Sequence, residues 1–285
     1  MNNRIKIPML ILLMLLTPSV PAKSNNKLVL TFGIYTSDKP SKMVRQFRPI
    51  LNELEQAMAT QLGQEVTIKT HVAPSYEQGL QNLVDGRVDF SRVGPASYVL
   101  AKKADPAIDL VAMELKKGQK EFYGVIVVAQ DSPIKTISDL KGKRFAFGDQ
   151  NSTIGRYLSQ QYLLQHKIHA KDLAAIDYLE RHDAVGAAVA SGLYHAGALK
   201  RSTFEHLVKK GHKLRELARF SNVTKPWVAK RALDPTVFAA LKKSLLALKD
   251  SAGLKQLKKS GFADTTDQDF AAIHRAIEDN ASFFQ

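Results

Sequence analysis

The sequence predicts an α/β fold of two similar lobes, each an open sheet flanked by helices, with a hinge and a ligand cleft between the lobes. Strand patterns that alternate with helical patterns, a weak internal repeat, and polar turns directly after strands all lead to this prediction. The chain has 285 residues, 45% hydrophobic and 24% charged, which suffices for the cores of two lobes.

Strand and helix patterns alternate in the first part of the chain. Residues 28–34 form an apolar run that is typical of a buried strand, and residues 66–72 alternate as a second strand should. Between them, Pro49 is expected to open an amphipathic helix that closes at Gly63. A further helix is expected from Tyr76 to Val84, before Asp85-Gly86.

The pattern continues in the second part. Residues 123–129 predict a strong strand, and residues 143–147 predict another that leads into a polar turn and a helix. Near the C-terminus, Asp234-Pro235 is expected to cap a helix, and residues 270–277 to form the last one.

The internal repeat supports the division into two lobes. Residues 76–86 and 182–192 span the same interval, each as a helix between strands that ends at glycine. The stretch 98–103 is echoed by 204–210. Residues just past the strand ends of both lobes are therefore expected to face each other across a cleft, where open α/β sheets bind ligands.

The N-terminus predicts export. Arg4 and Lys6 precede the apolar run 9–16, and Val20-Pro21-Ala22 follows as a cleavage site, so residues 1–22 are expected to be a signal peptide. The sequence contains no cysteine, which excludes disulfides, thiolate chemistry and a lipid anchor on cysteine. We therefore expect a diffusible, unanchored periplasmic protein that is a monomer.

The net charge of +14 favours anionic partners. Nucleic acid is the obvious competitor, but the basic residues are dispersed and no nucleic-acid motif is present, so none is predicted as a partner. The scattered histidines predict no metal site, no pattern calls for a cofactor, and no catalytic signature appears.

The turn after the strand 143–147 is the best candidate for an oxyanion site. Helix-start N–H groups favour negative charge, Ser152 and Thr153 add hydroxyl donors, and Gly155 is expected to let a ligand approach the backbone. Simple capping of the helix by Asn151 or Ser152 is the alternative, and the motif alone leaves it open.

Other candidates lie at related positions. His182 begins the repeated helix of the second lobe and is expected to titrate near neutral pH, and Tyr76 is its counterpart in the first lobe. Tyr123 lies where the chain enters the second lobe. The remaining candidates for ligand contact are Tyr35, Tyr98 and His195.

Several ordered motifs resemble the phosphonate-binding (PhnD-like) family of ABC-transporter periplasmic receptors. The resemblance runs from about residue 28 to about residue 248. It rests on the following segments: Tyr76 with Gly86-Arg87-Val88-Asp89, Val93-Gly94-Pro95-Ala96-Ser97-Tyr98, Tyr123-Gly124-Val125-Ile126-Val127, Ile137-Ser138-Asp139-Leu140-Lys141-Gly142-Lys143, Asn151-Ser152-Thr153 with Gly155, and His182-Asp183-Ala184.

The resemblance implies a type II periplasmic binding-protein fold that closes over its ligand by hinge bending. It implies that Ser152, Thr153 and His182 hold an oxyanion such as a phosphonate, phosphite or phosphate, while Tyr76 and Tyr123 contact the rest of the ligand. The implied lobes are 27–118 with 222–285, and 119–221, with crossings near 118–123 and 220–227.

Three departures from the family pattern affect the predicted specificity. His195 stands where relatives commonly carry an aspartate, Arg92 is either an anion contact or a solvated side chain, and Ile154 removes a hydroxyl from the usual Ser-Thr-Ser turn.

The leading hypothesis is a non-enzymatic receptor that delivers an oxyanion to an inner-membrane ABC permease. The alternative is a ligand sensor of the same fold that acts with a membrane histidine kinase. A third hypothesis is an exported enzyme that acts on a phosphorylated compound.

Overall fold

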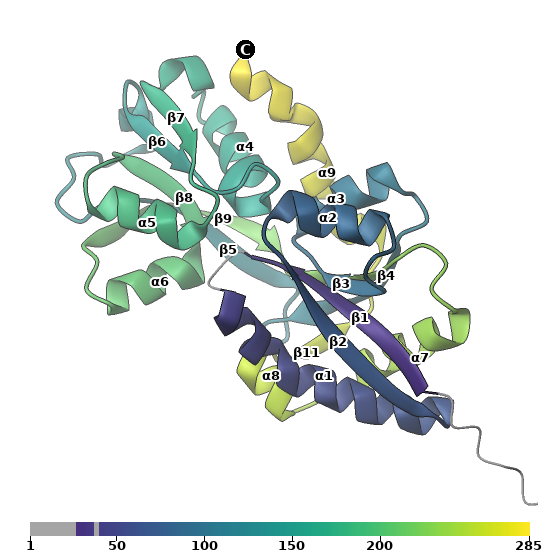
Figure 1. The fold of residues 1–285 in the computed structure, drawn as a ribbon. Helices are drawn as coiled ribbons and strands as arrows, with labels where there is room; N and C mark the ends of the chain where they lie inside the picture. Colours follow the sequence, from purple (N-terminus) through teal and green to yellow (C-terminus); the bar gives the residue numbers. More distant parts are fainter. Residues whose placement is uncertain (1–26, 37–39) are drawn as a thin grey trace, which may run out of the picture.

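Two sheets flanked by helices make up the protein, which we describe from a computed structural model of residues 27–36 and 40–285 (Figure 1). The expected signal peptide, residues 1–22, lies outside the described residues. The first sheet has the order β11-β4-β10-β3-β1-β2 and the second has the order β7-β6-β8-β5-β9. Within the described part of the chain, no helix is long and apolar enough to span a bilayer.

The strands of the first sheet are β1 (Lys27–Tyr35), β2 (Glu65–Ala73), β3 (Phe90–Arg92), β4 (Asp109–Leu115), β10 (Pro226–Ala229) and β11 (Gly261–Ala263). Its helices are α1 (Pro40–Leu62), α2 (Tyr76–Val84), α3 (Pro95–Ala104), α7 (Pro235–Ala247) and α8 (Ala252–Leu257).

The strands of the second sheet are β5 (Glu121–Ala129), β6 (Arg144–Phe147), β7 (Ala175–Tyr178), β8 (Ala196–Lys200) and β9 (Leu214–Val223). Its helical segments are η1 (Ile137–Leu140), η2 (Thr153–Tyr157), α4 (Leu158–Gln165), η3 (Ala170–Asp172), α5 (His182–Ala190) and α6 (Arg201–Lys209). The chain ends with η4 (Asp267–Phe270), α9 (Ala271–Glu278) and η5 (Asp279–Phe284).

Helix α1 begins earlier than the sequence suggested. The prediction that Pro49 opens this helix is wrong, because α1 starts at Pro40 and continues through Pro49. Met43 and Phe47 are buried in the first core together with Ile50, so one apolar stripe runs along the whole helix. Burial of that stripe outweighs the hydrogen bond that an internal proline removes.

The parallel strands of both sheets direct their carboxyl ends toward the interior of the molecule. Strand β1 pairs in parallel with β2 and β3, and β6 pairs in parallel with β7 and β8. Helix α2 follows β2, α3 follows β3, η2 follows β6 and α5 follows β7. The polar turns that the sequence placed after strands therefore lie at these strand ends.

The internal repeat corresponds to matching helices. Helices α2 and α5 each have nine residues, and each is followed by a glycine with positive φ, Gly86 at 69° and Gly192 at 77°. Only glycine adopts this left-handed conformation without strain, which explains why both repeat units end in glycine.

The chain crosses between the sheets twice, from β4 to β5 through a tight turn at Lys117-Gly118 and from β9 to β10 through Thr224 and Lys225. The crossings are hydrogen-bonded to each other: Glu114 N donates to Lys225 O (3.1 Å), and Thr224 N donates to Lys120 O (3.0 Å).

The C-terminal segment packs differently from the expected division, which placed all of 222–285 with the first lobe. The ring of Phe283 meets that of Phe147 edge-on at 5.7 Å, and Asn280 accepts a hydrogen bond from Arg156. Both partners belong to the second lobe, and α9 lies between α3 and η2 (Figure 1). The apolar face of this last segment, which includes Ile273, covers both lobes at once.

Candidate functional site

A small cavity lies between the two sheets, at the carboxyl ends of their strands. The space inside it that a water-sized sphere can reach is about 20 Å³. Clefts that hold drug-sized ligands are about 300–1,000 Å³, so the lobes leave little free room between them. Its lining residues are Tyr76, Gly94, Pro95, Phe122, Ser152, Thr153, Ile154, His182, Lys200, Asn222 and Lys225.

Four helices begin at this cavity. Tyr76 is the first residue of α2, Pro95 of α3, Thr153 of the continuous η2–α4 segment, and His182 of α5. Each helix start carries the positive end of a helix dipole, which favours an anion by about 0.3–1 kcal/mol. Their convergence from both lobes gives the cavity a geometry that favours an anion.

The two hydroxyl residues of the turn after β6 are held in place by backbone donors. Ser152 Oγ accepts from Gly155 N at 2.9 Å, and Thr153 Oγ1 accepts from Ala96 N at 2.8 Å. A hydroxyl that accepts such a bond still has its own O–H to donate. Ser152 therefore caps its helix and can also donate into the cavity, so both roles that the sequence left open are available.

The first turn of that helix is wider than an α-helical turn. Tyr157 N lies 3.3 Å from Ser152 O, and Leu158 N donates to Thr153 O, both with the five-residue spacing of a π-helix. Such turns are frequent at functional sites. The turn begins with Thr153, whose bond to Ala96 links the two lobes directly.

Tyr35 supports the cavity wall from behind. Its hydroxyl accepts from Gly94 N and shares a 2.9 Å hydrogen bond with Ser97, and its ring lies 4.1 Å from that of Tyr76. Burial raises the pKa of Tyr35 to about 12, so its hydroxyl stays neutral and holds Gly94 and Ser97 in place through hydrogen bonds. It does not line the cavity itself.

His182 is buried, with 3% of its surface exposed, and its Nδ1 has no hydrogen-bond partner. Burial, together with the positive charges of Lys200 and Lys225, lowers its pKa well below 6.5. The expectation that His182 titrates near neutral pH is therefore wrong for the empty cavity. A neutral imidazole with an unused ring nitrogen fits a hydrogen bond to a ligand.

Three polar residues of the cavity were not among the sequence candidates. Asn222 is 3% exposed, and neither Nδ2 nor Oδ1 has a partner. Lys200 ends β8, and Lys225 lies in the crossing from β9 to β10. Burial, Arg92 and Lys200 lower the pKa of Lys225 well below 10.5. A sequence signal existed for Lys200, a polar residue directly after an apolar strand; none marked Asn222 or Lys225.

Tyr123 points away from the cavity, although its segment was identified as the entry to the second lobe. Phe122 lines the cavity instead, and Asn222 is its cross-strand partner on β9. Successive side chains of a strand point to opposite faces, so Tyr123 lies on the outer face. There its hydroxyl donates to Glu121 at 2.9 Å.

The other candidates also lie outside the cavity lining. Gly155 has no room for a side chain because a Cβ would lie 2.8 Å from Gly148 Cα, so its close approach is to backbone rather than to a ligand. Tyr98 is buried and donates to Asp267. His195 lies before β8, at its amino end, and accepts from Arg144 N at 3.1 Å.

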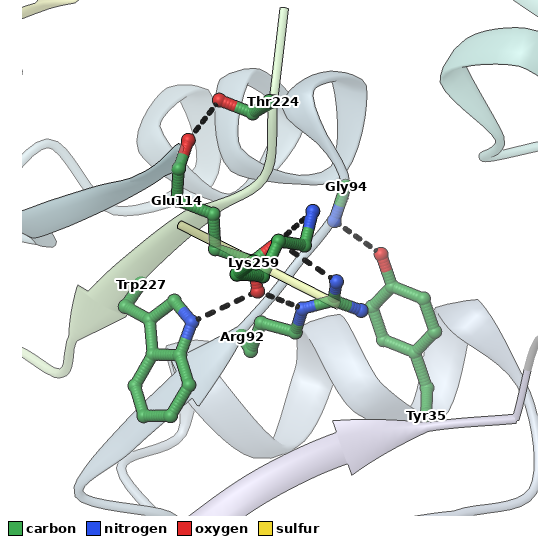
Figure 2. Close-up of polar contacts among 7 residues, drawn as sticks. All are labelled: Tyr35, Arg92, Gly94, Glu114, Thr224, Trp227 and Lys259. Carbon is green, nitrogen blue, oxygen red and sulfur yellow. Dashed lines mark hydrogen bonds and ion pairs between the residues drawn. The ribbon is translucent and has the colours of Figure 1, made fainter. Parts of the chain in front are cut away.

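Arg92 is neither an anion contact nor a solvated side chain. It forms a two-pronged ion pair with the fully buried Glu114, with Nε 2.6 Å from Oε1 and Nη2 2.9 Å from Oε2 (Figure 2). Lys259 Nζ lies 2.7 Å from the same carboxylate, and Trp227 Nε1 donates to it at 3.3 Å (Figure 2). We call these four residues the Glu114 cluster.

Two lobes joined by two crossings, with an anion cavity at their facing strand ends, define a solute-binding protein of the type II fold. The sequence model of the family described as "ABC transporter, phosphonate, periplasmic substrate-binding protein" matches residues 32–270. The chain belongs to this family, whose members are transport receptors rather than enzymes.

Relatives agree with this assignment. The probable ABC transporter phosphite binding protein PhnD1 of Prochlorococcus marinus (strain MIT 9301) is 28% identical over 224 residues, 76% of this chain and 71% of the relative. The structure of PhnD1 with methylphosphonate matches with a TM-score of 0.76 at 25% identity, covering 88% of this chain and 97% of that one. A binding protein component of a Pseudomonas aeruginosa ABC phosphonate transporter shares the fold, with a TM-score of 0.75, 20% identity and coverage of 88% and 86%.

Proposed function

We propose that this protein captures a small phosphorus oxyanion, of the phosphonate, phosphite or phosphate class, in the periplasm and delivers it to an inner-membrane ABC permease without chemical change. The observation that carries the proposal is the convergence of four helix starts on one small cavity. The phosphite and methylphosphonate named for the PhnD1 relative support this ligand class.

The proposed ligand contacts come from both lobes. Ser152 and Thr153 donate their hydroxyl protons and His182 donates from its neutral ring, while the start of α3 faces the anion from the first lobe with the positive end of its helix dipole. Binding then favours the closed form because only that form brings both sets of donors to one ligand.

Transport is favoured over sensing. The matched family and the PhnD1 relative are both described as components of ABC transporters. A receptor of this kind needs affinity and release rather than a reactive group, which agrees with a cavity built from helix starts and hydroxyl donors.

A thermal-shift screen tests the proposal. Methylphosphonate, phosphite, phosphate and methanesulfonate are added separately to the protein, and at least one phosphorus oxyanion is expected to raise Tm by several degrees, since a ligand at about 100 times its Kd stabilises by about 2.7 kcal/mol. Thr153→Val keeps the side-chain shape but removes the donor, and it is expected to reduce the shift.

Thr60→Val is the matched control, because Thr60 is an exposed residue of α1 and its hydroxyl donates to Gln56 O within the same helix. Its ligand-induced shift is expected to equal that of the wild type. If no phosphorus oxyanion raises Tm, the proposed function is wrong.

A further inference from the structure

Asn222 is a buried amide in the wall of the cavity. It is 3% exposed, and neither Nδ2 nor Oδ1 has a hydrogen-bond partner in the protein. Its cross-strand partner Phe122 lines the cavity as well, because residues that lie opposite each other on paired strands point to the same face of the sheet. A buried polar atom without a partner destabilises the folded protein, so this amide calls for an explanation.

The polar side chains on either side of Asn222 are paired within the protein. Ser221 lies on the outer face of the sheet and donates to Glu121, and Thr224 donates to the backbone oxygen of Glu114. Asn222 differs from both in that its side chain faces the cavity and forms none of these bonds. Its donor and its acceptor are therefore both available to a ligand.

The amide offers the ligand two different atoms. Nδ2 donates hydrogen bonds, whereas Oδ1 only accepts them. In the proposed contacts Ser152, Thr153 and His182 all donate to the anion, and no aspartate or glutamate is found among the described residues of the lining. An oxyanion without a proton gives Nδ2 an acceptor but leaves Oδ1 buried opposite another oxygen. A ligand that satisfies the whole amide must carry an O–H group.

We propose that Asn222 makes the cavity selective for an oxyanion that carries an O–H group, such as a singly protonated phosphonate, over a sulfonate. The proposal rests on the proposed function and narrows its ligand class. The P–O–H group donates to Oδ1 while another phosphonate oxygen accepts from Nδ2. A sulfonate of the same shape has no proton to donate, and a buried group built to bond a ligand hydroxyl discriminates against an analogue that lacks it.

A matched pair of ligands tests this selectivity by isothermal titration calorimetry at mildly acidic pH. Under these conditions methylphosphonate and methanesulfonate have nearly the same shape and the same single negative charge, but methylphosphonate alone carries a proton. The wild type is expected to bind methylphosphonate about tenfold or more tightly than methanesulfonate. Because the charges are equal, general attraction of anions to the cavity does not produce this difference.

Two variants of Asn222 separate its acceptor from its size. Asn222→Leu keeps a similar volume and removes both polar atoms, so the preference for methylphosphonate is expected to shrink to about threefold or less. Asn222→Asp keeps an acceptor and removes the N–H donors. It is expected to weaken both ligands but to retain the preference, because a shared proton separates the carboxylate from methylphosphonate and not from methanesulfonate.

Asn52→Leu is the matched control, because Asn52 is an exposed residue of α1 whose Oδ1 accepts from Arg48 Nε at 2.5 Å. Its preference is expected to equal that of the wild type. The ratio of two affinities is the readout, and partial unfolding of a variant does not change it. Equal binding of the two ligands by the wild type, an unchanged preference in Asn222→Leu, or a lost preference in Asn222→Asp overturns the selectivity proposal and leaves the proposed function standing. Failure of the wild type to bind methylphosphonate, phosphite or phosphate overturns both.

Discussion

Two groups of buried charges lie close together where the chain crosses between the sheets, and they are organised in opposite ways. In the Glu114 cluster the carboxylate is fully buried, and two cations and an indole N–H surround it (Figure 2). In the cavity, cations and neutral donors surround a space, and their lining includes no carboxylate among the described residues.

The two groups are connected through the short segment between β9 and β10. Lys225 O accepts from Glu114 N, while the hydroxyl of the neighbouring Thr224 donates to Glu114 O. This short segment thus bonds to the backbone of Glu114 through Thr224 and places the next residue, Lys225, in the lining of the cavity. The comparison indicates that the first group contributes to a fixed structure, while the second leaves buried polar atoms of His182 and Asn222 without a protein partner.

The largest expected effect is on the closed cluster. Glu114→Gln keeps the shape of the side chain but leaves Arg92 and Lys259 without their counter-ion in a buried site. We expect the free energy of unfolding to fall by about 3–5 kcal/mol, measured by urea denaturation. The lowered pKa of Glu114, caused by these two cations, adds a pH signature.

The sign of that signature follows from the direction of the shift. A carboxyl group whose folded pKa is depressed below 4.5 stabilises the protein above that pH and loses this contribution as the pH falls below it. The wild type should lose stability in that acid range more steeply than Glu114→Gln. Glu65→Gln, at an exposed ion pair with Lys27, is the control and is expected to change stability by less than about 1 kcal/mol. Equal effects of the two variants would contradict the assignment of the cluster.

The next prediction concerns the two faces of β5 beside the cavity. Phe122→Ala removes part of the apolar wall and is expected to weaken methylphosphonate binding about tenfold or more, as truncation of a buried aromatic contact does. Tyr123→Phe removes only an outward-facing hydroxyl that donates to Glu121 and is expected to leave binding unchanged. Calorimetric titration of both variants checks the assignment, which a larger loss in Tyr123→Phe would reverse.

Local sequence patterns predicted much of the fold. The strands 28–34 and 66–72 and the helices beginning at Tyr76 and Pro235 are present as expected, because apolar periodicity and capping residues are local signals. The early start of α1 and the packing of η5 on the second lobe were missed because tertiary burial decides both.

The cavity residues were predictable only where a local turn between a strand and a helix marked them. Ser152, Thr153, His182 and Tyr76 line the cavity as the sequence analysis expected of its candidates, since each lies at the start of a helix after a strand. Asn222 lies near the end of β9 and Lys225 in the crossing that follows it, where no local motif distinguishes a cavity residue from an exposed one. Phe122 lines the cavity and the predicted Tyr123 does not, because a one-residue step along a strand changes which face a side chain occupies.

The smallest expected effect is on the pH dependence of stability, which His182 is expected to influence and a bound ligand to change. A histidine whose folded pKa is lowered by burial costs stability once the pH falls below its ordinary value of 6.5, because the unfolded chain then takes up a proton that the folded protein resists. The loss is at most about 1.4 kcal/mol per pH unit, and His182→Asn is expected to remove it. The pKa of the exposed His195 is also lowered, by partial burial and by the charges of Arg144 and Lys143, so His195→Asn is the comparison and is expected to change the pH profile in the same direction but less. Bound methylphosphonate places a negative charge beside the imidazole and favours its protonated form, so it is expected to flatten the profile of the wild type, measured by urea denaturation at a series of pH values. A profile equally steep with and without ligand would mean that the imidazole does not face the anion, and that the cavity, like the Glu114 cluster, is complete without one.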